Sequence, residues 1–136
     1  MPLVSMDKQR TLPTAPTIPQ VTIQHSGELE SVKRYITLGV ALKILEHDIK
    51  VVEASNMKLP RLYKSLLRGL QDYVLLEIAA LRKQLRKAGI QIYNECKDAS
   101  GIRAEYVCRG YRHRFSLHWG FIRTEAERLI KQHLPR

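Results

Sequence analysis

Two long stretches of the chain carry apolar residues at three- and four-residue spacing, the spacing of one face of an α-helix. They cover about residues 26–55 and 61–88. Pro60 suits the first turn of the second helix, where an amide hydrogen would have no partner, and Gly89 suits the left-handed cap after its last turn. The pattern therefore predicts a long helical hairpin over residues 26–88.

The first predicted helix is apolar on two sides. One stripe comprises Leu38, Leu42, Leu45, Ile49 and Val52, and the other comprises Leu29, Val32, Ile36, Val40 and Ile44. Each apolar side of a helix needs a partner. The second predicted helix covers the first stripe, whereas the second stripe has no obvious partner within the chain. We therefore expect a homodimer whose interface contains Leu29, Ile36, Val40 and Ile44.

Beyond the hairpin the apolar period changes from 3.6 to 2, which is typical of strands with one buried face. Within residues 90–119, the segment 98–102 suits a three-residue hairpin loop closed by Gly101 in the left-handed conformation. A second turn, of type II′, is expected at Gly110 and Tyr111. The two turns predict an antiparallel three-stranded meander that keeps its apolar side chains on one face.

The predicted register also fixes the positions of the two cysteines. Cys96 is expected opposite Ala104, and Cys108 between Ile92 and His113. The two thiols then share a face but lie four residues apart, about 13 Å at the rise of a strand. A disulfide needs Cα atoms within about 7 Å, so we expect both cysteines to stay unpaired.

The two ends of the chain are expected to differ. Residues 1–25 form a Pro- and Thr-rich segment that predicts a flexible tail, although residues 20–24 alternate weakly, as a short strand would. Thr124 opens a capping-box sequence, which predicts a last helix over residues 124–134. We therefore expect a tail followed by one α+β domain, residues 26–136, with the order α-α-β-β-β-α.

Composition narrows the class of partner. The chain has 136 residues with 44% hydrophobic residues, enough for one domain with a core. Its net charge of +10 favours nucleic acid, an anionic membrane surface or an acidic protein as partner. The sequence contains neither an apolar run long enough to span a bilayer nor a secretory signal, and two cysteines are too few for a disulfide scaffold. A soluble cytoplasmic protein is expected.

The positive charge is concentrated toward the C-terminus. Residues 82–136 carry 13 basic and 5 acidic side chains. The predicted register places several cations and one aromatic ring on the outer face of the sheet, which the core does not need. We expect this face to bind nucleic acid, because arginine binds phosphate bidentately and a tyrosine ring can stack on an unpaired base. The expected binding residues are Lys97, Arg103, Arg109, Arg112, Arg114, Tyr93 and His118.

Candidate catalytic groups are few. The predicted register sets Glu95 opposite Glu105, and two facing carboxylates can bind a metal or divide acid and base roles. No third ligand accompanies them, and neighbouring cations can neutralise both. The chain has no glycine-rich phosphate loop and no Cys-x-x-Cys pair. The sequence therefore predicts a non-enzymatic protein without a metal or cofactor.

Two functions remain open at this stage. The first is non-enzymatic binding of DNA or RNA through the basic sheet face, in a regulatory or accessory role. The second is that of an adaptor or inhibitor that binds an acidic protein. Charges on a strand face can also serve solubility alone, so the sequence does not distinguish these functions from a merely solvated surface.

Overall fold

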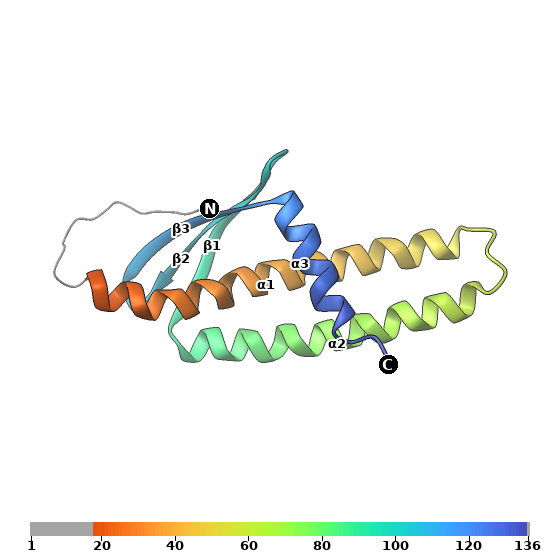
Figure 1. The fold of residues 1–136 in the computed structure, drawn as a ribbon, viewed down its shortest axis with the longest axis horizontal. Helices are drawn as coiled ribbons and strands as arrows, with labels where there is room; N and C mark the ends of the chain where they lie inside the picture. The colour runs from red at the N-terminus through yellow and green to blue at the C-terminus, as the bar shows by residue number, and fades with distance from the viewer. Residues whose placement is uncertain (1–17, 136) are drawn as a thin grey trace.

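The structure, a computed structural model, describes the backbone of residues 18–135 and the side chains of residues 27–135. Its elements are α1 (Ile18–Glu53), α2 (Pro60–Lys87), β1 (Ile90–Lys97), β2 (Gly101–Cys108), β3 (Tyr111–His118) and α3 (Trp119–Lys131). The predicted α+β fold with the order α-α-β-β-β-α is confirmed. Figure 1 shows α1 and α2 side by side, with the sheet along the N-terminal part of α1 and α3 crossing α1 toward α2.

Helix α1 begins earlier than the apolar pattern predicted. It starts at Ile18, so Ser26 lies inside the helix and is not its cap, and residues 20–24 are helical instead of extended. Pro19 is compatible with this start because a proline in the first turn removes no hydrogen bond. The rest of the expected tail, residues 1–17, lies outside the described residues.

The hairpin core confirms the first stripe of α1. Leu38 and Leu45 pack against Val74, Ile78 and Leu81 of α2. Leu129 of α3 is buried in the same cluster, and Leu42, Leu67 and Leu70 pack on its margin. The last turn of α3 is thereby fixed onto the middle of the hairpin.

The second stripe of α1 packs against the chain's own sheet, which removes the reason for expecting a dimer interface at these positions. Ile36 is buried with Ile102, Leu117 and Ile122, which come from β2, β3 and α3. The other three residues of the predicted interface are partly buried: Val40 packs on this cluster, Leu29 packs on the cluster around Tyr106, and Ile44 is half-exposed. The sequence pattern did not reveal this partner because the meander folds back over α1 from far along the chain.

The register between the first two strands differs from the prediction, because Ile90 and not Ile92 pairs with Cys108 and a bulge interrupts β1. Ile92 pairs with Tyr106 and Tyr93 with Glu105, but Cys96 pairs with Arg103. Two residues of β1, 94 and 95, therefore stand opposite one residue of β2, and Asn94 has a positive φ of 52°. Residues after the bulge change face, so Cys96 is exposed rather than opposite Ala104.

The second turn is also of a different type. Cys108 pairs with Tyr111, not with His113, so Arg109 and Gly110 are the central turn residues. Both have positive φ, 49° and 89°, as a type I′ turn requires. The predicted pairing was shifted by two residues, which leaves every side chain of β3 on its predicted face because the side-chain period of a strand is two.

The loop between β1 and β2 joins three elements. Asp98 Oδ1 accepts hydrogen bonds from the amides of Ser100 and Gly101 at 2.8 and 3.1 Å. These backbone hydrogen bonds lower the pKa of Asp98 below its usual value, with a smaller contribution from Arg103. The indole Nε1 of Trp119 donates to the carbonyl of Asp98 at 2.7 Å, so the loop also anchors the start of α3.

Gly101 is needed for space and not for a left-handed conformation, contrary to the prediction. Its φ is not positive. A Cβ atom at this position would lie 1.9 Å from the carbonyl oxygen of Leu117 on β3. Glycine is therefore required where β2 and β3 come together most closely.

Helix α3 starts at Trp119, five residues before the predicted cap. Thr124 lies inside the helix, and its hydroxyl donates to the carbonyl of Gly120 at 3.0 Å. The capping-box prediction is wrong. His118 occupies the N-cap position without a side-chain hydrogen bond to the helix.

Cys96 and Cys108 are both free thiols, as predicted, with Cys96 exposed and Cys108 buried. Burial and a hydrogen bond to Glu28 raise the pKa of the Cys108 thiol to about 11. Within residues 18–135, no helix combines the length and the apolar character required to cross a membrane.

Candidate nucleic-acid interface

The alternation of side chains gives the sheet two distinct faces. The inner face packs on α1 and α3 through buried residues such as Ile102 and Tyr106. The outer face is formed by Gln91, Tyr93, Arg103, Glu105, Val107, Arg112, Arg114 and Ser116. None of these outer side chains is buried. The outer face is therefore an accessible surface that contributes little to the core.

Arg112 and Arg114 are the most available cations of this face. Both are exposed on β3, opposite Val107 and Glu105 of β2. Among the described residues, no ion pair or hydrogen bond occupies either guanidinium group. Their side chains are two residues apart on one strand and thus point the same way. They can reach neighbouring anionic groups of one ligand.

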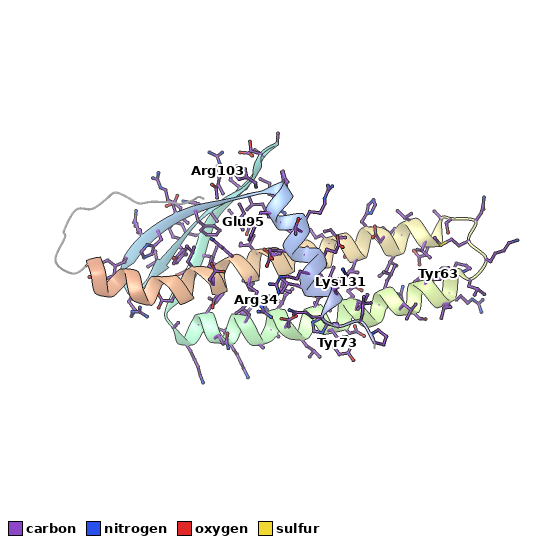
Figure 2. The ribbon with its side chains drawn as sticks, in the orientation of Figure 1. Arg34, Tyr63, Tyr73, Glu95, Arg103 and Lys131 are labelled. Carbon is purple, nitrogen blue, oxygen red and sulfur yellow. The ribbon has the colours of Figure 1, made fainter. Side chains whose placement is uncertain are left out.

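Arg103 lies on the same face but is partly engaged. It pairs with Cys96 on one side and Ser116 on the other, and its guanidinium lies 3.2 Å from Asp98 Oδ2. Two-thirds of its side chain (66%) remains exposed. Figure 2 shows Arg103 at the sheet end of the molecule, far from Tyr63 at the hairpin loop. An exposed ion pair of this kind is weak, so an anionic ligand could compete for Arg103.

Arg109 has a structural role that the sequence did not indicate. Its guanidinium lies 2.8 Å from Glu28 Oε2 and donates to the carbonyl of Ala88 at 3.3 Å. The hydrogen bond to Glu28 raises the pKa of Arg109 above its usual value. Arg109 therefore ties the β2–β3 turn to α1 and to the C-terminal end of α2, and we remove it from the candidate interface.

The other three predicted residues lie at different places. Tyr93 is on the outer face, half-buried, and its hydroxyl is buried without a hydrogen-bond partner among the described residues. Lys97 is displaced from the outer face because the bulge changes the alternation, and it pairs with Ile102. His118 is exposed at the end of β3, opposite Gly101. Of these three residues, only Tyr93 and His118 thus lie on the outer face with the arginines.

The predicted pair of facing carboxylates does not form. Glu105 stands opposite Tyr93 and Arg114, and Asn94 Nδ2 donates to its Oε2 at 3.3 Å. Glu95 lies in the bulge. In the described part of the chain, no three His, Cys, Asp or Glu side chains come together in a way that could hold a metal ion.

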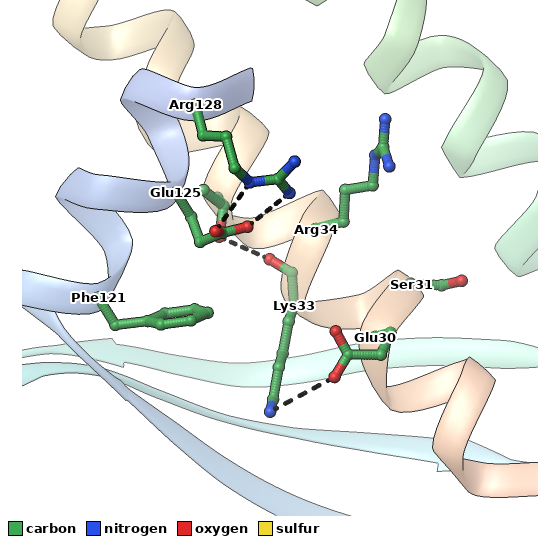
Figure 3. A pocket seen from close by; sticks show the side chains of 8 residues that line it. Glu30, Ser31, Lys33, Arg34, Phe121, Glu125 and Arg128 are labelled. Atoms are coloured by element: carbon green, nitrogen blue, oxygen red, sulfur yellow. Dashed lines mark hydrogen bonds and ion pairs between the residues drawn. The ribbon is translucent and has the colours of Figure 1, made fainter. Parts of the chain in front are cut away.

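A hollow lies between α1 and α3 (Figure 3). Its lining is charged but internally neutralised: Arg128 binds Glu125 at 2.8 Å, and Lys33 lies 3.9 Å from Glu30. Arg34, which also lines it, binds Glu77 of α2. Each cation of the lining thus has an acidic partner on its own helix or on α2, so the hollow provides no uncompensated charge for a ligand.

Comparison with known proteins identifies the family. The chain belongs to the YhjD protein family, with a match that covers residues 23–136. No curated protein and no solved structure matches it. The family name carries no activity, so it assigns no function to the outer face of the sheet.

Proposed function

We propose that this member of the YhjD family is a non-enzymatic, cytoplasmic nucleic-acid-binding protein that uses the outer face of its sheet. The observation that carries the proposal is the exposed pair Arg112 and Arg114, neither of which forms an ion pair or a side-chain hydrogen bond with a described residue. Arg103 extends the positive surface, His118 adds an exposed imidazole ring, and Tyr93 offers part of a ring for stacking. The proposal includes both DNA and RNA.

The charge of the molecule supports this ligand class. A net charge of +10 attracts polyanions, and arginine recognises phosphate with a planar fork of donors. The outer face is a flat sheet surface, and the pairing of its strands holds its cations in fixed positions. Such a surface fits an extended backbone of phosphates better than a small molecule, which requires a cleft.

Salt titration with a double variant tests the proposal. The full chain would be titrated into labelled single-stranded RNA, single-stranded DNA and duplex DNA at several salt concentrations. Each phosphate contact contributes about 0.7–0.9 to the slope of log affinity against log salt. Arg112→Gln with Arg114→Gln should therefore weaken binding and reduce the magnitude of that slope by between about one and two.

A matched control removes the same charge elsewhere. Arg61 and Arg68 are exposed in the first half of α2, which begins after the α1–α2 loop. Figure 1 shows this loop at the end of the hairpin opposite the sheet. Arg61→Gln with Arg68→Gln should leave the slope nearly unchanged. Equal effects of the two double variants would show that only net charge matters, and an unchanged affinity in the Arg112 and Arg114 variant would reduce the outer face to a solvated surface.

The second candidate function is binding of an acidic protein. It is favoured by the mixed character of the outer face, where Val107 and Tyr93 share the surface with the arginines, since aromatic residues and arginine are enriched in protein interfaces. Absence of binding to all three nucleic acids, together with capture of an acidic partner that the Arg112 and Arg114 substitutions abolish, would favour this function over the first.

A further inference from the structure

Helix α2 carries a second apolar stripe on its solvent side. Its buried stripe faces α1, through residues that include Val74, Ile78 and Leu81. The solvent-side stripe, called here the α2 seam, consists of Leu62, Leu66, Gly69, Tyr73, Leu76 and Ala80. The four large side chains of the seam are exposed by between 51% and 69%, the largest value being that of Leu76. Such a surface has no role in the core of this chain.

The seam follows the repeat of a helix-pairing surface. Its members are separated by four, three, four, three and four residues, which is the heptad spacing at which two helices keep contact along their length. From Leu62 to Ala80 the seam extends about 27 Å at the rise of an α-helix. It contains no charged residue, so it does not select a partner by charge.

Gly69 is an independent sign of a closely approaching partner. It lies inside a helix of 28 residues, where glycine costs about 1 kcal/mol relative to alanine. A Cβ atom here would meet nothing within 4 Å in the chain, so intrachain packing does not require glycine. A small residue in a heptad seam leaves room for a large side chain of a facing helix.

The end of α3 orients the largest side chain of the seam. The rings of Tyr73 and His133 stack at a centroid distance of 5.0 Å and an interplanar angle of 3°. His133 is held in turn by Glu77 at 2.7 Å. Figure 2 shows Tyr73 where the end of α3 reaches α2. Tyr73 still exposes about half of its surface (52%).

We propose that the α2 seam binds the α2 seam of a second copy of this chain, with the two helices antiparallel. A two-fold axis near residue 71 places Gly69 opposite Tyr73, Leu62 opposite Ala80 and Leu66 opposite Leu76. Each layer then combines one large and one small side chain, or two leucines, as close packing requires. A parallel pair would instead set glycine against glycine and tyrosine against tyrosine.

The charge on α2 also favours the antiparallel arrangement. Its last turns carry Arg82, Lys83, Arg86 and Lys87. In a parallel pair these clusters would meet, whereas in the antiparallel pair they lie about 40 Å apart. That distance is several times the screening length of about 8–10 Å at moderate salt. The proposal is independent of nucleic-acid binding, and it moves the expected dimer interface from α1 to α2.

Sedimentation of two variants of neighbouring leucines tests the surface. Leu76 is in the seam, whereas Leu75, which is 48% exposed, lies about 100° away around the helix. The parent chain should sediment as a dimer at micromolar concentrations. Leu76→Glu should raise the dimer dissociation constant at least about tenfold, whereas Leu75→Glu should leave it nearly unchanged. Circular dichroism should show the same helix content in both variants, because both positions face solvent.

Two outcomes of these sedimentation measurements would contradict the proposal. A parent chain that is monomeric at all accessible concentrations has no partner copy on the seam. Equal effects of Leu76→Glu and Leu75→Glu would assign self-association to another surface or to general charge.

Cysteine cross-linking tests the orientation in a Cys96→Ser background. Ala80→Cys protein alone should not form cross-linked dimers, because the two Ala80 positions lie about 27 Å apart in the antiparallel pair. A mixture of Leu62→Cys protein and Ala80→Cys protein should form the mixed disulfide under mild oxidation. Rapid self-cross-linking of Ala80→Cys protein would contradict the antiparallel arrangement.

Discussion

Gly101 illustrates how a single residue position is determined by a contact remote in sequence. The alternation of β2 gives no indication that its first residue faces the backbone of β3. In the structure the carbonyl oxygen of Leu117 occupies the space that a Cβ atom on residue 101 would need. The amide of Gly101 donates to Asp98 in the adjoining loop, and the carbonyl of Asp98 accepts from the indole of Trp119. A displacement at Gly101 therefore affects the start of α3.

Gly101→Ala should destabilise the protein by about 1–3 kcal/mol, because the added methyl group must displace the backbone of β3. Gly120→Ala is the matched control: a Cβ at Gly120 meets nothing within 4 Å, and alanine favours the helix. It should cause no loss and a gain of up to about 1 kcal/mol. Denaturant unfolding of both variants checks the difference, and similar losses in the two would contradict the close contact.

Glu77 connects the three helices through charge. It binds Arg34 of α1 and His133, which follows α3. Burial alone would raise the pKa of Glu77, but hydrogen bonds from Arg34 and His133 more than offset it, and the pKa is lowered below its usual value near 4.5. A carboxyl group with a lowered folded-state pKa stabilises the protein above its unfolded-state pKa, and this contribution is lost as the pH falls through the folded-state value.

Glu77→Gln should therefore lower the free energy of unfolding at pH 7 by about 1–2 kcal/mol. The difference from the parent chain should shrink as the pH falls below about 4.5 and through the lowered folded-state pKa of Glu77. Glu127→Gln, an exposed position on α3, is the control and should change little at either pH. A gap between parent and Glu77→Gln that is constant from pH 7 to pH 3 would exclude the proposed charge effect.

Helix α3 gives a test of where an element begins. A capping residue and an interior residue respond oppositely to alanine. Loss of a threonine cap costs about 1 kcal/mol, whereas an exposed interior threonine has a poorer helix propensity than alanine by up to about 0.7 kcal/mol.

Thr124→Ala should therefore raise the free energy of unfolding by a few tenths of a kcal/mol, because Thr124 lies inside α3 and bonds back to Gly120. A thermal melt measures the sign directly. A loss near 1 kcal/mol would restore the start of the helix to Thr124.

The elements themselves were predictable where periodicity is long. The stripes of α1 and α2 repeat over many turns, so the hairpin itself was predicted. Both ends of α2 were predicted to within one residue. Gly89, which follows α2, has the positive φ that was predicted for it. The faces of β2, of β3 and of β1 before its bulge were also predicted correctly, because errors of two residues in register conserve the face. Periodicity alone was sufficient for the α+β order.

The details that depend on distant contacts were not predictable. The bulge at Asn94 arises without a proline or glycine signal, and it moved Cys96 and Lys97 to other faces. Arg109 was assigned to the candidate interface because the turn was placed one residue late, and its partner Glu28 is far away in sequence. Five of the predicted site residues, Arg103, Arg112, Arg114, Tyr93 and His118, do lie on the outer face.

The whole molecule is elongated, with the sheet at one end of the hairpin and the α1–α2 loop at the other (Figure 1). The two proposed surfaces differ in chemistry. The outer face of the sheet is charged and polar, whereas the α2 seam is apolar and uncharged. Salt should therefore act on them in opposite directions: it weakens phosphate contacts and screens the repulsion between two chains of charge +10.

Raising the salt concentration from about 50 mM to about 500 mM should release bound nucleic acid while it strengthens self-association. Fluorescence anisotropy and sedimentation on one sample series measure the two effects. Self-association that weakens with salt would indicate a dimer held by charge, in conflict with the α2 seam.

The bulge in β1 has a consequence for colloidal behaviour. In the described part of the chain β1 pairs only with β2, so its other edge exposes backbone groups to which a strand from another molecule could add. A flat edge of eight residues would be a template for aggregation. Asn94 and Glu95 interrupt it, since they occupy the space of one residue and increase the local twist. The longest regular stretch of this edge, Ile90 to Tyr93, is too short to pair stably with an incoming strand.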